Sequence, residues 1–273
     1  MKVIRNPQTL QKICLKLAGK NIGLVPTMGA LHAGHLSLIK KSVAQNDVTI
    51  VSIFVNPKQF APGEDYLKYP RPLKKDLGIC RAAKVDYVFA PSPEDMYSNE
   101  HLTYVEVLKT GERLCGMSRE GHFKGVATVV AKLFNITFAD NAYFGLKDFQ
   151  QLKVIQQMAR DLNFKSRVIA CPTVRESDGL AMSSRNVYLT APERAQALKI
   201  SAALQNAKGK KIQTVKNFVK NEISKIKNVK IDYIELLDAH NLQKTSAKTK
   251  EIVIAVAVWV GKTRLIDNMI FKV

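Results

Sequence analysis

Residues 22–55 read IGLVPTMGALHAGHLSLIKKSVAQNDVTIVSIFV. The apolar run Ile22–Val25 predicts a short strand, and Val48–Val55 predicts a second strand because it is almost continuously apolar and β-branched. Between them, residues 33–45 carry apolar side chains at spacings of three and four, which is typical of a helix. Because a strand, a helix and a strand follow in this order, the segment predicts a parallel sheet.

The same alternation of strands and helices continues to about residue 174 and then changes. Further helices are expected at residues 73–83, 125–137 and 148–162, and further strands at residues 85–89, 103–108, 142–144 and 167–173. Beyond these come two helices within residues 192–226 and three strands at residues 230–237, 252–260 and 263–271. We therefore predict an α/β fold, with a doubly wound parallel-sheet, Rossmann-like domain at residues 1–174 and a smaller α+β domain, a lid, at residues 175–273.

The bulk composition is that of a globular protein with a sizeable core. The 273 residues are 46% hydrophobic and 24% charged, and no apolar stretch reaches the length of a membrane span. Pro7 interrupts the N-terminal segment before a signal-peptide core can form, so no export is expected. The four cysteines are far apart, which indicates free thiols in a reducing cytoplasm.

The formal net charge of +19 leaves two interpretations open. A strongly basic chain is typical of nucleic-acid-binding proteins, but it is equally compatible with a solvated surface on an enzyme whose ligands are anions. The lysines are dispersed, and the densest run, Lys208–Lys230, has no series of aromatic residues for stacking on bases. The solvated surface is the simpler interpretation.

The two histidines His32 and His35 lie where the first strand meets the first helix. Residues three apart on a helical turn share a face, and the N-terminus of a helix attracts anions through its free N–H groups and its dipole. Gly34 between them removes a side chain where a ligand would come close. The pair therefore indicates a phosphate site, although a simple turn or a chance metal site gives the same pattern.

Three other polar segments follow predicted strands or the domain boundary. Each has a simpler interpretation: Asn56–Phe60 as a turn, Gly145–Gln151 as a capped helix start, and Met182–Asn186 as a solvated loop. In open α/β sheets, however, ligands bind at the carboxyl ends of the strands. Amides in the first segment, Lys147 in the second and Arg185 in the third would suit a polar substrate and a phosphate.

Taken together, these segments resemble the pantothenate synthetase (pantoate–β-alanine ligase) family, part of the nucleotidylyltransferase-like ATP-binding superfamily with its HIGH-type motif. The matching segments are spread over roughly two thirds of the chain in the family's order. They are residues 25–35, 51–60, 69–71, 121–123, 143–151 and 178–186. The C-terminal domain matches the family only in size and general pattern.

The resemblance implies an ATP-dependent condensation in two steps. Pantoate first forms pantoyl adenylate with release of pyrophosphate, and the amine of β-alanine then displaces AMP to give pantothenate. Catalytic roles fall on residues near the phosphates, with His35 as the proton donor: His32, His35, Lys147, Ser183, Ser184 and Arg185. The ATP contacts implied by the resemblance are Met28, Gly29, Ala30, Leu31, His32, Ala33, Gly34, His35, Gly145, Leu146, Lys147, Asp148, Val174, Met182, Ser183, Ser184 and Arg185.

The resemblance also implies the remaining ligands and partners. Gln59 is expected to hold pantoate and β-alanine, Gln151 to hold pantoate, and Asn56 to line the substrate site. Magnesium is implied with ATP. Lys74 and Lys75 stand where certain members of the family carry acidic residues, so Asp76 is the nearest carboxylate, and ATP and water are expected to complete the metal's shell. A cytoplasmic homodimer is expected, without nucleic-acid or membrane partners.

Two other functions remain open from the sequence. An adenylyltransferase with a phosphorylated substrate would share the histidine motif, but the neutral amides of Gln59 and Gln151 favour a hydroxy acid over a phosphorylated acceptor. A nucleic-acid-binding protein or a fragment of an aminoacyl-tRNA synthetase is favoured by the net charge alone, since no separate stacking or anticodon-binding module is evident.

Overall fold

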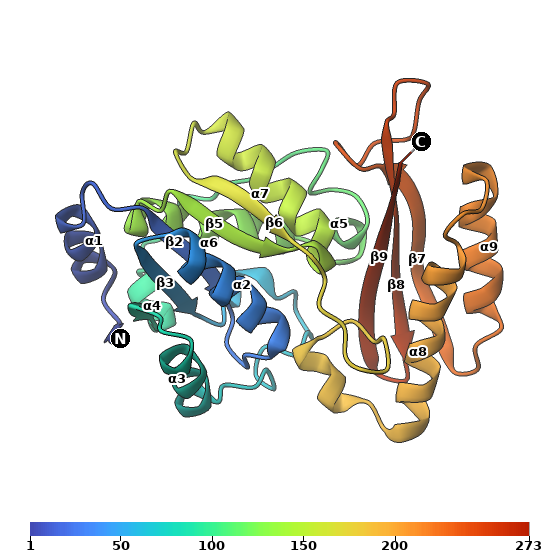
Figure 1. Cartoon of the computed structure of the whole chain (residues 1–273), viewed down its shortest axis with the longest axis horizontal. Coiled ribbons are helices and arrows are strands. Elements are labelled where there is room, and N and C mark those ends of the chain that lie inside the picture. The colour runs from blue at the N-terminus through green and yellow to red at the C-terminus, as the bar shows by residue number, and fades with distance from the viewer. Residues whose placement is uncertain (273) are drawn as a thin grey trace.

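A parallel six-stranded sheet organises the first part of the chain in the computed structural model, which describes residues 1–272. The strands lie in the order β1-β4-β3-β2-β5-β6, and β2 occupies the middle, where the direction of winding reverses (Figure 1). Leu24 of β2 pairs with Ile50 of β3 on one side and Ala142 of β5 on the other. The bounds are β1 Lys2–Ile4, β2 Ile22–Thr27, β3 Val48–Ile53, β4 Tyr87–Phe89, β5 Asn141–Gly145 and β6 Arg167–Cys171.

Helices cover both faces of this sheet, and the alternation of side chains along the strands decides which residue meets which layer. Leu24 and Ile50 pack with α1, α6 and α7, whereas Val25 and Val51 pack with α2 and α3. The helices are α1 Pro7–Lys16, α2 Ala33–Gln45, α3 Leu73–Ala82, the short α4 Pro93–Met96 and α5 Cys115–Ser118, α6 His122–Thr137 and α7 Phe149–Asp161. Short 3₁₀ turns follow β3 at η1 (Pro57–Gln59) and β5 at η2 (Leu146–Asp148).

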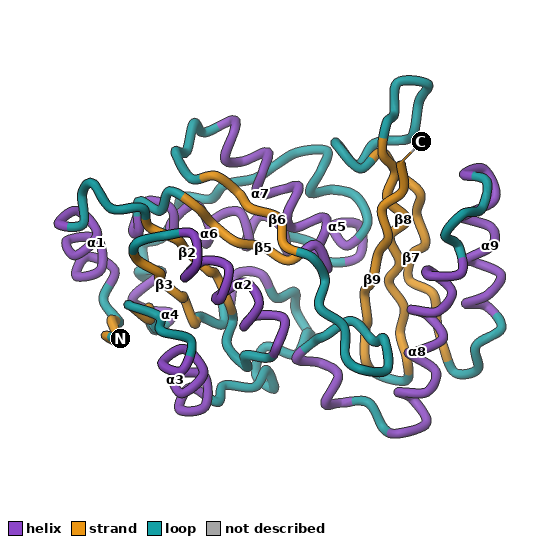
Figure 2. Tube along the Cα trace, viewed as in Figure 1, coloured by secondary structure: helices purple, strands orange, loops and turns teal. Residues whose placement is uncertain are grey.

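The second part of the chain forms an antiparallel three-stranded sheet beside the first. After the 3₁₀ turn η3 (Ser184–Tyr188), it comprises α8 Ala191–Asn206, α9 Ile212–Ser224, β7 Val229–Asp238, β8 Glu251–Val260 and β9 Thr263–Lys272. Ile254 and Val256 of β8 pack with α8 and α9, which lie on the outer side of the sheet (Figures 1 and 2). Val253 and Ala255 face the other way and pack against Phe149 of α7. The apolar run of β8 is therefore explained by burial on both faces.

The predicted fold class is confirmed, with differences in detail. The helix predicted at residues 33–45 matches α2, but the strand predicted at residues 103–108 is wrong, because this segment has no strand partner among the described residues. No pattern in the sequence indicated β1, which is three residues long and pairs with the distant β4. The predicted boundary after residue 174 lies between β6 and η3 and stays a prediction. No helix within residues 1–272 is long and apolar enough to cross a membrane.

Gly125 sets the distance between α6 and the turn η1, which carries Gln59. A Cβ at this position would collide with the backbone carbonyl of Lys58 and lie 2.7 Å from the Gln59 nitrogen. A side chain here would therefore push the turn away from the sheet. Gly78 of α3 offers a contrast, since it is exposed and a Cβ there would meet nothing within 4 Å.

These two helical glycines predict opposite effects of the same substitution. Gly125→Ala should lower the free energy of unfolding by about 1–3 kcal/mol, because the backbone contact must open. Gly78→Ala should raise it by about 0.5–1 kcal/mol, because alanine restricts the unfolded chain and favours the helix. Urea unfolding of both variants checks this, and a neutral Gly125→Ala would show that the contact is not tight.

Candidate active site

Two joined cavities lie at the carboxyl ends of β2, β3 and β5. The smaller, of about 210 Å³, is lined by residues from all four polar segments that the sequence singled out. The larger, of about 960 Å³, opens between the first sheet and the three-stranded sheet. The two cavities share Lys147, Asp148, Gln151, Ser183 and Arg185.

Most of the predicted site residues therefore meet in one place. The smaller cavity is lined by Met28, His32, Gly34, His35, Asn56, Gln59, Gly145, Lys147, Asp148, Gln151, Val174, Met182, Ser183, Ser184 and Arg185. Gly29, Ala30, Leu31, Ala33 and Leu146 are not among its lining residues. They lie next to it in the chain, so any contact they make with a ligand would use the adjoining backbone.

The histidine pair caps the N-terminus of α2. Nδ1 of His32 accepts a hydrogen bond from the Gly34 nitrogen at 3.1 Å, and Nδ1 of His35 accepts one from the His32 nitrogen at 3.4 Å. A neutral imidazole that accepts at Nδ1 carries its proton on Nε2. The ring centroids are 4.1 Å apart, so the cap holds two Nε2–H donors side by side. Gly34 is needed for this arrangement, because a Cβ there would lie 2.8 Å from Cε1 of His32.

Burial keeps both imidazoles neutral. It lowers the pKa of His32 to about 4, with a further lowering from the charge of Lys147. It lowers the pKa of His35 to about 3, and His32 and Lys147 act in the same direction. At neutral pH both rings are therefore hydrogen-bond donors without charge.

Asp76, the carboxylate that the sequence places nearest to an expected metal, holds the loop that leads into α2. Its two carboxylate oxygens accept hydrogen bonds from the nitrogens of Ala30 and Leu31, each at 2.9 Å, and the residue is 1% exposed. These bonds fix a backbone that is left-handed at Gly29 (φ +81°) and at Ala30 (φ +50°). Among the described residues, no group of three or more His, Cys, Asp or Glu side chains is placed to hold a metal ion.

Asn56 orients Gln59. Its Nδ2 donates to Oε1 of Gln59 at 3.0 Å and to the Gly125 carbonyl at 3.1 Å, and its Oδ1 accepts from the hydroxyl of Tyr97 at 2.8 Å. With these partners the Asn56 amide, which is 1% exposed, is engaged within the protein. The Gln59 amide is thereby turned so that its Nε2 lies toward Met28, at the smaller cavity.

His122, which the sequence predicts to shape the site rather than to react, supports the backbone of Gln59 together with Arg119 and Glu64, which the sequence did not indicate. Nδ1 of His122 donates to the Gln59 carbonyl at 2.7 Å, while its Nε2 accepts from Arg119 at 2.9 Å. Arg119 is held in turn by both carboxylate oxygens of Glu64, at 2.6 and 2.7 Å. Burial, reinforced by Arg119, lowers the pKa of His122 to about 3, so His122 is also neutral at pH 7.

Three polar residues of the segment Gly145–Gln151 make different contacts. Asp148 precedes α7 but makes no side-chain cap, so its carboxylate is exposed in the cleft. The buried Gln150 binds the backbone of the 110–115 loop, accepting from the Cys115 nitrogen and donating to the Thr110 carbonyl. Gln151, one residue on, lines both cavities instead.

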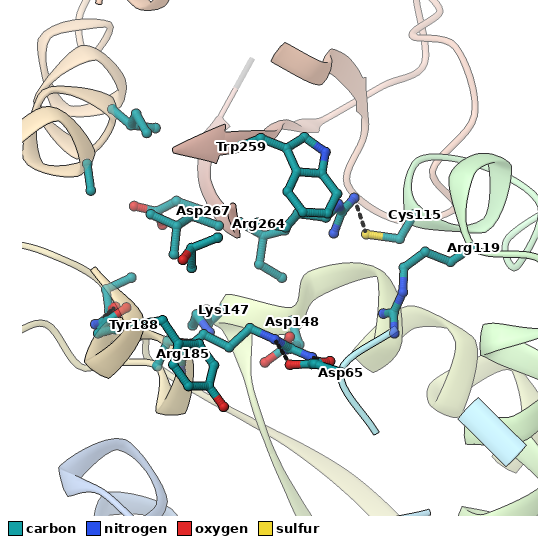
Figure 3. Close-up of a pocket in the computed structure, with 18 of the residues that line it drawn as sticks. Asp65, Cys115, Arg119, Lys147, Asp148, Arg185, Tyr188, Trp259, Arg264 and Asp267 are labelled. Carbon is teal, nitrogen blue, oxygen red and sulfur yellow. Dashed lines mark hydrogen bonds and ion pairs between the residues drawn. The ribbon is translucent and has the colours of Figure 1, made fainter. Parts of the chain in front are cut away.

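Arg185 is bound to an acid across the cleft. Its Nε and Nη2 donate to the two carboxylate oxygens of Asp65 at 3.0 and 2.9 Å, as Figure 3 shows. Burial alone would raise the pKa of Asp65, but the hydrogen bonds and charge of Arg185 outweigh burial and hold the pKa below its usual value. The adjacent Ser184 hydroxyl lies 3.2 Å from that of Tyr69. The Met182–Arg185 segment is therefore tied to residues 65–69.

Known proteins match this chain over nearly its whole length. The model of the Pantoate-beta-alanine ligase family matches residues 2–270. The chain belongs to the pantoate–β-alanine ligase family. A pantothenate synthetase of Endomicrobium trichonymphae is 56% identical over 275 residues, covering 98% of this chain and 97% of the relative.

Solved structures of pantoate–β-alanine ligases share the fold. The crystal structure of the Thermus thermophilus pantothenate synthetase superposes with a TM-score of 0.93 at 39% identity, covering 98% of this chain and 99% of the other. The Francisella tularensis pantoate-beta-alanine ligase, described as complexed with beta-gamma ATP and beta-alanine, gives a TM-score of 0.83 at 40% identity over 98% and 97% of the two chains.

The depressed histidine pKa values of this family member predict an observable tautomer. Nitrogen-15 NMR at pH 6 should show His32 and His35 as neutral rings protonated on Nε2, with signals assigned by their loss in single His→Ala variants. Because the unfolded histidines have a pKa near 6.5 and bind more protons below it, the free energy of unfolding should fall as the pH drops from about 6.5 toward 4. A His35 signal that titrates near pH 6.5 would contradict the buried neutral pair.

Proposed function

We propose that the cleft joins pantoate to β-alanine with ATP, through pantoyl adenylate, with release of pyrophosphate and AMP. The observation that carries this proposal is the convergence of two neutral amides, Gln59 and Gln151, with Lys147 and the histidine-capped N-terminus of α2 on one cavity. Amides suit the hydroxyl and carboxylate groups of a hydroxy acid, and the other groups suit phosphates.

ATP would lie along the N-terminus of α2, with contacts from Met28–His35, Gly145–Asp148, Val174 and Met182–Arg185. The Nε2–H donors of the histidine pair face this cavity together with the free N–H groups of the helix. Lys147 adds a positive charge where the two cavities meet. Since a carboxylate and a triphosphate repel each other, such fixed donors are needed before the two can react.

In the first step, a pantoate carboxylate oxygen attacks the α-phosphorus of ATP, and the bond to the pyrophosphate oxygen breaks. The negative charge that develops on the phosphates falls beside Lys147 and the histidine pair. With its pKa near 3, His35 would serve here as a neutral hydrogen-bond donor rather than as an imidazolium acid. In the second step, the amine of β-alanine attacks the acyl carbon, loses a proton, and AMP leaves with the bridging oxygen.

Arg185 would exchange its partner during this reaction. In the structure Arg185 donates two hydrogen bonds to Asp65, and a phosphate could take the place of this carboxylate because it offers the same bidentate geometry. Ser183 and Ser184, which precede Arg185 in the chain, bring two hydroxyls to the same wall of the cavity. Their proposed task is to hold the phosphates with Arg185.

Pantoate would be held between Gln59 and Gln151, with β-alanine also reaching Gln59. The network from Asn56, His122 and Arg119 supports the orientation of Gln59, so Asn56 would act through Gln59 rather than on the substrate itself. This assigns to the buried amide a positioning role in place of direct binding.

Magnesium would enter as the companion of ATP. Asp76 does not fit a metal ligand here, because both of its oxygens bind backbone N–H groups and the side chain is buried. A cation bound to phosphate oxygens and water, which is the usual coordination of Mg²⁺ with nucleotides, needs no such ligand.

A homodimer in the cytoplasm completes the proposal. Tyr104 and Leu108 are exposed on the segment predicted to be a strand, and Leu102 is exposed just before it. An exposed apolar segment of this kind suits pairing with a second copy. Buried free cysteines are compatible with a reducing compartment. Sedimentation equilibrium should give twice the chain mass of 30.5 kDa, and Leu108→Lys should shift it toward the monomer; a monomeric wild type would exclude this assembly.

The reaction is tested by following AMP production from ATP with each acid omitted in turn. We expect release to require both pantoate and β-alanine, and His35→Ala to slow it by about a hundredfold or more without unfolding the protein. Release of AMP without pantoate, or near-normal turnover of His35→Ala, would contradict the proposal.

Adjacent glutamines provide a matched pair for the same assay. Gln151→Ala should raise the KM for pantoate by about tenfold or more with an unchanged unfolding midpoint, since its amide lines the cavity. Gln150→Ala should instead lower the unfolding midpoint, because it leaves buried backbone groups without partners. Equal effects of both substitutions on pantoate KM would argue that Gln151 is structural.

A further inference from the structure

Strand β9 contacts the turn that carries Lys147 and the base of the segment that carries Arg185. Its consecutive residues Asp267 and Asn268 both line the larger cavity, although they belong to the three-stranded sheet rather than to the ATP-binding segments. Figure 3 shows Asp267 across the cavity from Lys147 and Arg185. We propose that Asn268 is a positioning residue for adenylate formation, with Asp267 as its companion; this inference rests on the proposed function.

Asn268 holds the backbone of the turn that carries Lys147. Its Nδ2 donates to the carbonyl of Leu146 at 2.9 Å and to the carbonyl of Lys147 at 3.0 Å. Both donor hydrogens of the amide are therefore directed at one short 3₁₀ turn. Neither Gly145 nor Asp148 gives this turn a side-chain cap. The side-chain hydrogen bonds that hold its carbonyls come from Asn268 of the three-stranded sheet.

Asp267 holds the base of the segment that carries Arg185. Its carboxylate accepts two hydrogen bonds from Arg175, at 2.7 and 3.0 Å, and it is 7% exposed. Arg175 also donates to the Gly179 carbonyl and to the Ser201 hydroxyl of α8, which closes the turn before Met182–Arg185. A bidentate, buried ion pair of this kind fixes direction as well as distance.

Successive side chains of a β-strand point to opposite faces of the sheet, which explains why the neighbours Asp267 and Asn268 bind different segments. Asp267 lies on the face of β9 that meets α8, as Leu265 does, whereas Asn268 lies on the face turned toward α7 and η2. Because both residues belong to one paired strand, the spacing between their two targets is set by the sheet. One strand, β9, thereby helps to position both Lys147 and the segment that carries Arg185.

This arrangement makes the three-stranded sheet part of the phosphate site. If β9 moves relative to the first sheet, the carbonyls of residues 146 and 147 lose their donors and the Lys147 ammonium loses its fixed position. A misplacement of about 1 Å at a reacting group costs about a hundredfold in rate. The effect should fall on the step that handles the triphosphate, not on the later attack of β-alanine.

The test compares the two half-reactions in Asn268 variants. Pantoate-dependent exchange of pyrophosphate into ATP reports adenylate formation, and formation of pantothenate from supplied pantoyl adenylate and β-alanine reports the second step. We expect Asn268→Ala to slow the exchange by about tenfold to a hundredfold and the second step by less than about threefold. Asn268→Asp, which has the same shape but presents oxygens to the two carbonyls, should slow the exchange at least as much.

Trp259, the only tryptophan in the sequence, adds a readout without turnover. It lies on β8 and faces the larger cavity, as Figure 3 shows. ATP alone should change its fluorescence in the wild type, and the titration should give a weaker apparent affinity in Asn268→Ala by about tenfold. Asn221→Ala, an exposed asparagine substitution on α9 in the same domain, is the matched control and should leave all three measurements unchanged.

Several outcomes would overturn the inference. Exchange by Asn268→Asp at the wild-type rate would remove the role of the two donated hydrogen bonds. If Asn268→Ala slowed both half-reactions equally and also lowered the unfolding midpoint, Asn268 would contribute only to the stability of the fold. Should Asn268→Ala fail to fold, Asn268→Ser keeps one donor and must still slow exchange more than the second step. A wild type without pantoate-dependent exchange would instead refute the proposed function.

Discussion

The start of helix α2 at the carboxyl edge of β2 is the constraint on which the remaining site depends. Because β2 is central in a parallel sheet, the helix that follows it must begin beside the ends of β3 and β5. The reciprocal cap between His32 and His35 then satisfies two of the free N–H groups and leaves both Nε2–H donors available. Asp76 fixes the loop before the cap through its two hydrogen bonds to backbone nitrogens.

The three-stranded sheet supplies the side of the cleft that faces the carboxyl ends of the parallel strands. Its strand β8 is buried on both faces, and the contact between Ala255 and Phe149 sets it against α7. This packing closes the cleft on the side of Lys147 and brings residues more than a hundred positions apart into hydrogen-bonding distance, as Asn268 and Leu146 illustrate. Residues of the three-stranded sheet thus form one wall of the larger cavity.

The sequence predicted what depends on local pattern. Helix α2 and the three C-terminal strands follow from periodicity, and the polar segments that meet in the cleft follow from their place after strands. The prediction of a strand at residues 103–108 was wrong because an alternating pattern specifies an extended chain but not the strand with which it pairs. The hydrogen bonds of Asp76 and Asn56 could not be predicted, because in a sequence a polar residue that faces a ligand looks the same as one that binds a backbone N–H group or another side chain. Asn268 was missed because its partners are distant in the chain, although the adjacent polar pair Asp267 and Asn268, flanked by apolar residues on both sides, was a usable signal.

The central claim is that a carboxylate oxygen of pantoate attacks the α-phosphorus of ATP in this cleft. Pantoate labelled with oxygen-18 in its carboxylate tests it most directly, with mass analysis of the nucleotide after turnover with unlabelled ATP and β-alanine. Attack by the carboxylate should give AMP that carries one oxygen-18 atom per molecule, because the bridging oxygen of the adenylate leaves with AMP. Unlabelled AMP, or label that appears in inorganic phosphate with ADP as the product, would contradict it.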